Sequence, residues 1–151
     1  MLQGKTALIT GGSSGIGLAT ARLLREHGAR VAITGSSRDK LGIAAAKLGE
    51  GVLTIQGNVA SLDDLWQLRE ELAREFGALD VLFANAGVAF ATPIDTTDEA
   101  SYHTMMDVNV KGVFSTIQSV LPLMSKGGSI ILNTSWLNQV GTSGRALLSA
   151  S

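Results

Sequence analysis

Short apolar runs alternate along the chain with longer segments whose apolar residues recur at helical spacing. Each run is too apolar throughout to have one face in water, which indicates strands buried on both faces. The expected strands span Lys5 to Thr10, Arg30 to Thr34, Val52 to Gln56, Asp80 to Ala84 and Ser129 to Asn133. This alternation is typical of βαβ units, so it predicts an α/β fold with a doubly wound parallel sheet in three α/β/α layers.

The segments between the strands carry helix start and stop signals. Ile16 and Leu23 lie on an apolar stripe of the first helix, and Gly28 follows as a left-handed stop. Ser61 and Thr96 each precede an acidic residue three positions later, as N-cap residues do. The expected helices span Gly15 to His27, Arg38 to Leu48, Ser61 to Phe76 and Thr96 to about Met124, with a break near Asp107 left open.

Length and composition fit a single domain, residues 1–151, without repeats or low-complexity linkers. The chain has no Cys, so it can form neither a disulfide nor a thiolate site for zinc. His27 and His103 lie too far apart in sequence for a local metal motif, and we expect no metal site.

The charge balance argues against two classes of partner. The 12 Lys and Arg against 13 Asp and Glu leave a net charge of −1, which offers no broad basic field for nucleic acid or an anionic membrane. No apolar run approaches the roughly 18 residues that span a bilayer, and the first residues lack the features of a secretory signal. We therefore expect a cytoplasmic protein.

A glycine-rich turn, Thr10 to Gly17, follows the first predicted strand directly and precedes the first helix. A dinucleotide pyrophosphate needs backbone N–H groups and a positive helix end close to it, and side chains at the glycine positions would obstruct that approach. The turn lacks the Lys of a P-loop, which argues against an ATPase. The alternative is a turn that serves only close packing of strand and helix.

Four motifs resemble the short-chain dehydrogenase/reductase family, in the family's order and over the whole chain. They are the TGxxxGIG-like segment TGGSSGIG from Thr10, the NAG segment Asn85 to Gly87, Asp107 to Gly112, and SIILNTS from Ser129 to Ser135. The resemblance implies a Rossmann fold with strand order 3-2-1-4-5, incomplete at its C-terminal side. It also implies a nicotinamide cofactor, oxidoreduction of a small carbonyl or secondary alcohol, and a homo-oligomer in the full-length form.

The end of the second predicted strand bears on which cofactor binds. An NAD site usually has a carboxylate about 20 residues beyond the glycine turn, whereas this chain has Ser36, Ser37 and Arg38 there. Hydroxyls and a guanidinium suit a 2′-phosphate, so we predict NADP in preference to NAD, although such a turn is also an ordinary helix start. The predicted cofactor-binding residues, several of them assigned through the resemblance, are Gly11, Ser13, Ser14, Gly15, Ile16, Gly17, Ser36, Ser37, Arg38, Asn58, Val59, Asn85, Ala86 and Gly87.

The resemblance places the family's catalytic Ser at Ser135 and its Asn at Asn109, but the Tyr position, thirteen residues beyond the Ser, holds Leu148. The family's Lys would follow Ser151, so the chain is expected to be truncated before it and to be inactive or severely impaired. One explanation is a fragment of a reductase in which another group supplies the proton. The other is a non-catalytic or regulatory NAD(P)-binding protein.

Ordinary structural roles remain open for these residues. Ser135 could cap a turn, and Asn109 could bond to backbone groups from a helix. A third hypothesis is an interaction module built on Met105 to Met124, which in the family forms dimer contacts, although its apolar residues also fit a core. The last strand is expected at a sheet edge with Ile130 to Leu132 poorly covered.

Overall fold

The computed structural model describes residues 1–151 and contains one parallel sheet of five strands in the order β3-β2-β1-β4-β5. The pairing is parallel at each of the four junctions. The strands are β1 (Thr6–Thr10), β2 (Arg30–Gly35), β3 (Leu53–Gln56), β4 (Leu79–Ala84) and β5 (Met124–Leu132). The predicted α/β fold and its strand order are confirmed.

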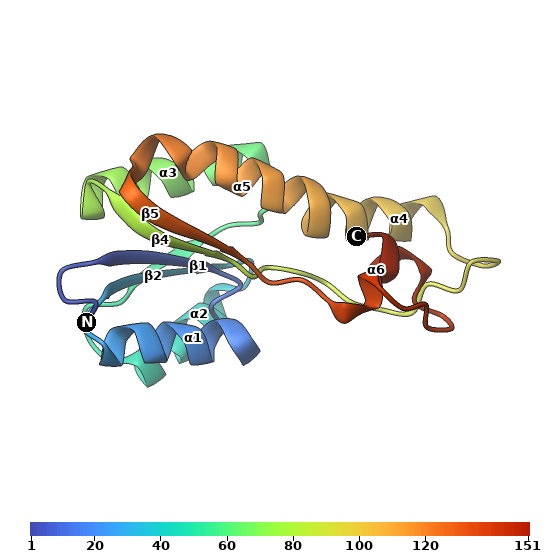
Figure 1. Cartoon of the computed structure of the whole chain (residues 1–151), viewed down its shortest axis with the longest axis horizontal. Helices are drawn as coiled ribbons and strands as arrows, with labels where there is room; N and C mark the ends of the chain where they lie inside the picture. The colour runs from blue at the N-terminus through green and yellow to red at the C-terminus, as the bar shows by residue number, and fades with distance from the viewer.

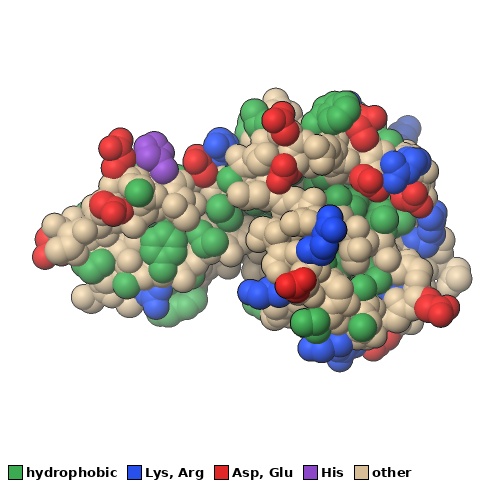
Figure 2. All heavy atoms as spheres, turned by 180° about the vertical axis from the view of Figure 1, so that it is seen from behind, with side chains coloured by type: hydrophobic (Ala, Val, Ile, Leu, Met, Phe, Trp, Pro, Cys, Tyr) green, Lys and Arg blue, Asp and Glu red, His purple; other side chains and the backbone are tan.

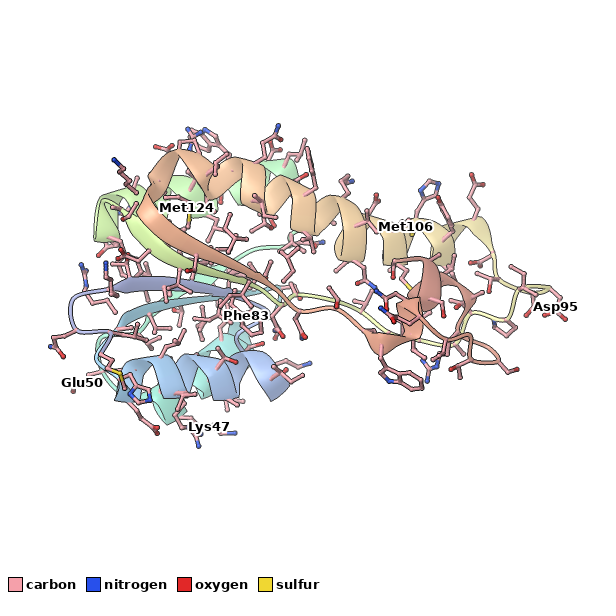
Figure 3. All side chains as sticks on the ribbon, viewed as in Figure 1. Lys47, Glu50, Phe83, Asp95, Met106 and Met124 are labelled. Carbon is pink, nitrogen blue, oxygen red and sulfur yellow. The ribbon has the colours of Figure 1, made fainter.

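Helices cover both faces of the sheet (Figure 1). α1 (Gly15–Glu26) and α2 (Arg38–Leu48) lie on one face, and α3 (Leu62–Phe76) and α5 (Gly112–Val120) lie on the other. Successive strand residues point to opposite faces, so Ile9 packs in the core on the α1 side while Leu8 packs in the core beneath α3. Phe83 of β4 belongs to the α1 side as well (Figure 3). β1, β2 and β4 are largely buried on both faces, as expected, and supply two separate cores. The same expectation is wrong for the two edge strands, because each has a neighbouring strand on one side only: β3 has one buried residue and β5 has none.

The first helix differs from the apolar stripe expected for it. Ile16 and Leu23 are 62% and 54% exposed, and the buried residues of α1 are Gly17 and Ala21. Small residues let the helix backbone approach the sheet closely, and this approach outweighs the burial of the larger side chains. The predicted stop is confirmed, since Gly28 has a φ of +93°.

The long helical segment before β5 is continuous but changes its winding. It begins at Glu99 rather than Thr96, because Asp98 is the N-cap and its carboxylate accepts a hydrogen bond from Ser101 N–H at 2.8 Å. The interruption left open near Asp107 is a π-helical turn, not a break. The segment consists of α4 (Glu99–Met106), η1 (Asp107–Lys111), α5 and the 3₁₀ turn η2 (Leu121–Leu123).

β5 forms one edge of the sheet and begins at Met124, five residues earlier than expected, with an irregular register beside Leu79 and Val81. Ile130, Ile131 and Leu132 are 39%, 49% and 50% exposed, which confirms the poorly covered edge. No helix has both the length and the apolar character that a membrane crossing requires. Acidic and basic side chains are interspersed over the visible face in Figure 2.

A lobe projects beyond the carboxyl ends of the strands (Figure 1). It comprises α4, the 3₁₀ turn η3 (Trp136–Asn138), α6 (Ala146–Ala150) and the loop that carries Asp95 at its far tip (Figure 3). Fully buried Thr92 joins two parts of this lobe: its N–H donates to Gly144 O at 2.8 Å, and its hydroxyl accepts from Leu147 N–H at 3.1 Å. These bonds fix the start of α6 to the Thr92 segment within the lobe.

Candidate functional site

The glycine-rich turn lies where the chain connections leave the sheet in opposite directions. β1 is paired with β2 on one side and with β4 on the other, so the carboxyl ends of β1 and β4 flank a topological switch point, where ligands bind in open α/β sheets. The backbone N–H groups from Ser13 to Gly17 donate to no acceptor in the protein. Ser14 provides no side-chain cap, and the first turn of α1 contains no acidic residue. An uncapped, positive helix end therefore faces this crevice.

Two of the glycines adopt backbone conformations that other residues avoid. Gly11 and Gly15 have φ values of +64° and +51°. A Cβ on Gly11 would lie 3.0 Å from the Ala86 Cα, and one on Gly17 would lie 2.3 Å from the Gly11 carbonyl oxygen. The turn is thus closed tightly against both the helix and the segment after β4.

Asn85, which follows β4, fastens that segment to the turn. Its side-chain amide donates to the carbonyl oxygens of Thr10 at 3.1 Å and Gly11 at 3.3 Å, and its Oδ1 accepts from the Asn133 side chain at 2.9 Å. The buried Thr10 hydroxyl accepts from the N–H groups of Asn85 and Ala86, both at 3.0 Å. The sequence analysis missed this role of Thr10; a Thr closing an apolar strand is the signal that could have indicated it.

A cleft of about 550 Å³ opens over the turn. It brings together most of the predicted cofactor residues, but neither Gly17, which lies beneath the turn, nor Arg38 lines it. Lys40, which the sequence analysis did not select, does line it. The predicted residues in the lining are Gly11, Ser13, Ser14, Gly15, Ile16, Ser36, Ser37, Asn58, Val59, Asn85, Ala86 and Gly87.

The far wall of the cleft is held by Asp64 of α3. Its carboxylate accepts from Asn58 N–H at 2.7 Å, while Ser61 caps α3 by accepting from Asp64 N–H at 3.2 Å. The Asn58 Oδ1 accepts from Ala60 N–H at 3.0 Å, which leaves the Asn58 side-chain NH₂ free to donate into the cleft. Val59 is 8% exposed and supplies an apolar surface beside it.

A second cavity of about 660 Å³ adjoins the first and shares its Asn85 to Val88 wall. It brings Asn109 and Ser135 together with Leu148, the residue at the expected Tyr position. No Asp, Glu, Lys, Arg, His or Tyr side chain lines this cavity. The one Tyr, Tyr102, is 46% exposed on α4 and contacts the His103 ring edge-on.

Asn109 and Ser135 both have structural partners as well. The Asn109 side chain accepts from Val88 N–H at 2.9 Å, donates to Val88 O at 3.0 Å, and donates to Ser151 Oγ at 3.1 Å. The π-helical turn carries Asn109, and π-turns often occur at functional sites. Ser135 Oγ accepts from Leu137 N–H at 3.2 Å, so the turn-capping alternative is observed. Its own hydroxyl proton is not used in that bond.

The carboxyl groups with displaced pKa values lie outside both cavities. Hydrogen bonds, first from Thr6 N–H and then from the Lys5 ammonium, lower the pKa of Asp80 at the opposite end of the sheet. The N-cap bonds to Ser101 lower the pKa of Asp98. Neither cavity therefore contains a carboxyl tuned for proton transfer.

The parallel sheet, the uncapped helix end and the adjoining cavities define a Rossmann-type domain with a polar cleft at its switch point. The family profile for short chain dehydrogenase matches residues 5–151. The chain therefore belongs to the short-chain dehydrogenase family.

Individual proteins show the same relationship. Oxidoreductase asL5 of Sarocladium schorii is 45% identical over 98% of this chain, and the 3-oxoacyl-[acyl-carrier-protein] reductase FabG of Staphylococcus epidermidis is 37% identical over 94%. A crystal structure of a short-chain dehydrogenase/reductase, glucose/ribitol dehydrogenase, from Brucella melitensis matches 98% of the chain with a TM-score of 0.94 at 30% identity. The chain spans only 59%, 61% and 64% of these three proteins.

Proposed function

We propose that this chain is the cofactor-binding part of an NADP(H)-dependent oxidoreductase that acts on a carbonyl or secondary alcohol. The observation that carries the proposal is the run of unbonded N–H groups at the N-terminal end of α1, where Ser13 to Ile16 line a cleft of about 550 Å³. Such a run suits a pyrophosphate because it offers several donors and the positive end of a helix together. The missing carboxylate after β2 and the two serines there favour the 2′-phosphate of NADP.

The residues present fit a dinucleotide along the cleft. When bound, the nicotinamide supplies or accepts a hydride. The turn from Gly11 to Gly17 would hold the pyrophosphate, and Ser36 and Ser37 would donate to the 2′-phosphate. Asn58 and Val59 would hold the adenine, and Asn85 to Gly87 would hold the sugar nearer the nicotinamide, since this segment is the wall shared by both cavities.

Of the family's catalytic residues, Ser135 and Asn109 would be the two present in the second cavity. The free hydroxyl proton of Ser135 could donate to a substrate oxygen, whereas Asn109 fixes the Val88 backbone. A positioned general acid typically contributes about 10²–10⁴ in rate, and no ionisable side chain lines this cavity. We therefore expect the 151-residue chain to turn over a carbonyl substrate slowly or not at all.

Calorimetric titration with NADPH and NADH tests the proposal. The wild-type chain should bind both, NADPH more tightly. The informative variant is Ser14→Asp: Asp is as good an N-cap as Ser, so α1 is retained, but its carboxylate repels the phosphates. We expect this variant to bind both cofactors about tenfold or more weakly, given the size of charge interactions at helix ends.

Ser143→Asp is the matched control, because Ser143 is exposed and lines neither cavity. It should bind both cofactors as the wild type does. The proposal fails if the wild type binds neither cofactor, or if Ser14→Asp binds as tightly as Ser143→Asp.

A second candidate is a non-catalytic protein that senses NADP(H), and the observation behind it is that Leu148 lines the second cavity where the family's Tyr is expected. The two candidates differ in turnover. Loss of reduced nicotinamide absorbance when the full-length protein is given a carbonyl compound would exclude the sensor, whereas tight binding without turnover by the full-length protein would support it.

We also propose that the full-length protein is a homo-oligomer, with η1 and α5 as a contact surface. Met105 is fully buried and so belongs to the core, but Val110 and Phe114 are 42% and 65% exposed. An unchanged oligomeric state in a Phe114→Ser variant, measured by sedimentation velocity, would count against this surface.

A further inference from the structure

The cleft contains one charged side chain among its eighteen lining residues, and that side chain is Lys40. Lys40 lines the cleft together with Ser36 and Ser37, at the end where β2 leads into α2. The Lys40 ammonium makes no ion pair with any carboxylate of the chain. A single cation without an ion pair therefore belongs to the wall of the cleft at the end that the 2′-phosphate would occupy.

Arg38, the cation expected there from the sequence, is directed elsewhere. Its Nε donates to the Gln56 side-chain oxygen at 3.2 Å, and the Gln56 amide donates in turn to Ser36 O at 3.1 Å. Gln56 thus holds the guanidinium at the end of β3, and Arg38 does not line the cleft.

Helix geometry explains why the two cations differ. Arg38 is the first residue of α2, and Lys40 lies two positions later, which places their side chains roughly 200° apart around the helix axis. Ser37 and Lys40 are three positions apart and so share a face. The Ser37 hydroxyl accepts from the backbone N–H of Lys40 at 3.3 Å, which fixes the backbone of this first turn, and both residues line the cleft.

We propose that Lys40, rather than Arg38, is the residue that determines the preference for NADP over NAD. The inference rests on the proposed function, because it names the cation of that same site. A Lys ammonium acts as a point charge and not as a bidentate fork, so the preference should also decrease as ionic strength rises.

Two matched neutralisations test the assignment, Lys40→Gln and Arg38→Gln. Each removes one positive charge from the first turn of α2 and installs a residue of good helix propensity. The measurement is the dissociation constant of NADP⁺ and of NAD⁺ for the complete chain, at low and at moderate salt, with circular dichroism as the check on folding.

Lys40→Gln should raise the dissociation constant of NADP⁺ by about tenfold or more, as expected for a lost hydrogen bond between charged groups. It should change the dissociation constant of NAD⁺ by less than about twofold. Arg38→Gln should leave the ratio of the two constants within about twofold of wild type. If Arg38→Gln removes the preference and Lys40→Gln retains it, the inference is overturned while the proposed NADP specificity stands. If the wild type does not prefer NADP⁺, the proposed specificity and this inference fall together.

Discussion

Gly17→Ala should destabilise the fold and weaken dinucleotide binding, because the added methyl group has no room. The new Cβ would lie 2.3 Å from the Gly11 carbonyl oxygen and 2.6 Å from the Asn85 side-chain nitrogen. Since the first of these atoms belongs to the backbone, α1 must move away from the turn. Overpacking of this kind costs about 1–3 kcal/mol, and the better helix propensity of Ala returns up to about 1 kcal/mol. We expect a net loss of about 1–2 kcal/mol in the free energy of unfolding.

Gly42→Ala is the matched control and should have the opposite sign. Gly42 lies within α2, and a Cβ there would meet no atom within 4 Å, so the variant should gain about 0.5–1 kcal/mol. Urea unfolding followed by tryptophan fluorescence measures both variants, and titration with NADPH shows whether the displaced helix end still binds. If both variants are equally or more stable than the wild type, the argument from close packing at Gly17 is refuted.

Three further results are expected elsewhere in the molecule. The pKa of Asp80 is lowered, first by Thr6 N–H and then by Lys5. The ionised carboxylate therefore stabilises the fold fully above its unfolded pKa of about 4, and this stabilisation is lost as pH falls through the lower folded pKa. Asp80→Asn should reduce the loss of stability in acid, measured as the urea midpoint between about pH 2 and 6, a window around the reference pKa of about 4. Midpoints that change identically in the wild type and the variant would contradict this. Asn109→Ala should lower the free energy of unfolding by about 1–3 kcal/mol, because it leaves both Val88 backbone groups without their partner. The control Asn138→Ala, in the same cavity but without a side-chain hydrogen bond, should stay within about 0.5 kcal/mol of the wild type. Equal losses in the two variants would argue against the Val88 bonds. Ile131→Lys should reduce self-association through the exposed β5 edge, as measured by light scattering. The control Ile43→Lys, on exposed α2 surface, should not reduce it. The same reduction in both variants would point to net charge alone.

Much of the fold could be predicted because the apolar runs are short and separated by helical segments, and because β1, β2 and β4 are largely buried on both faces. The glycine turn followed from its residues and its place between the first strand and the first helix, and the strand order followed from the resemblance; the structure confirms the order. The start of α4 was wrong because Thr96 and Asp98 are both good N-cap residues, and only the local chain path decides which one accepts a bond from the helix.

The candidate site was predictable at the level of segments and less so at the level of side chains. The motifs indicated the turn, the Asn85 segment and the Ser135 strand end, and these do lie around two adjoining cavities. The direction of Arg38 could not be predicted, because it depends on Gln56, a residue eighteen positions away on β3.

The amino-acid sequence by itself determined the alternation of strands and helices, the glycines that permit a tight turn, and the lack of a Tyr at position 148, because these depend on residue type and local spacing. Tertiary structure alone decided which face of α1 is buried, that Asn85 holds the turn, and that Lys40 and not Arg38 faces the cleft. Those outcomes depend on distances between residues far apart in the chain, and such distances exist only once the sheet and its helices have packed.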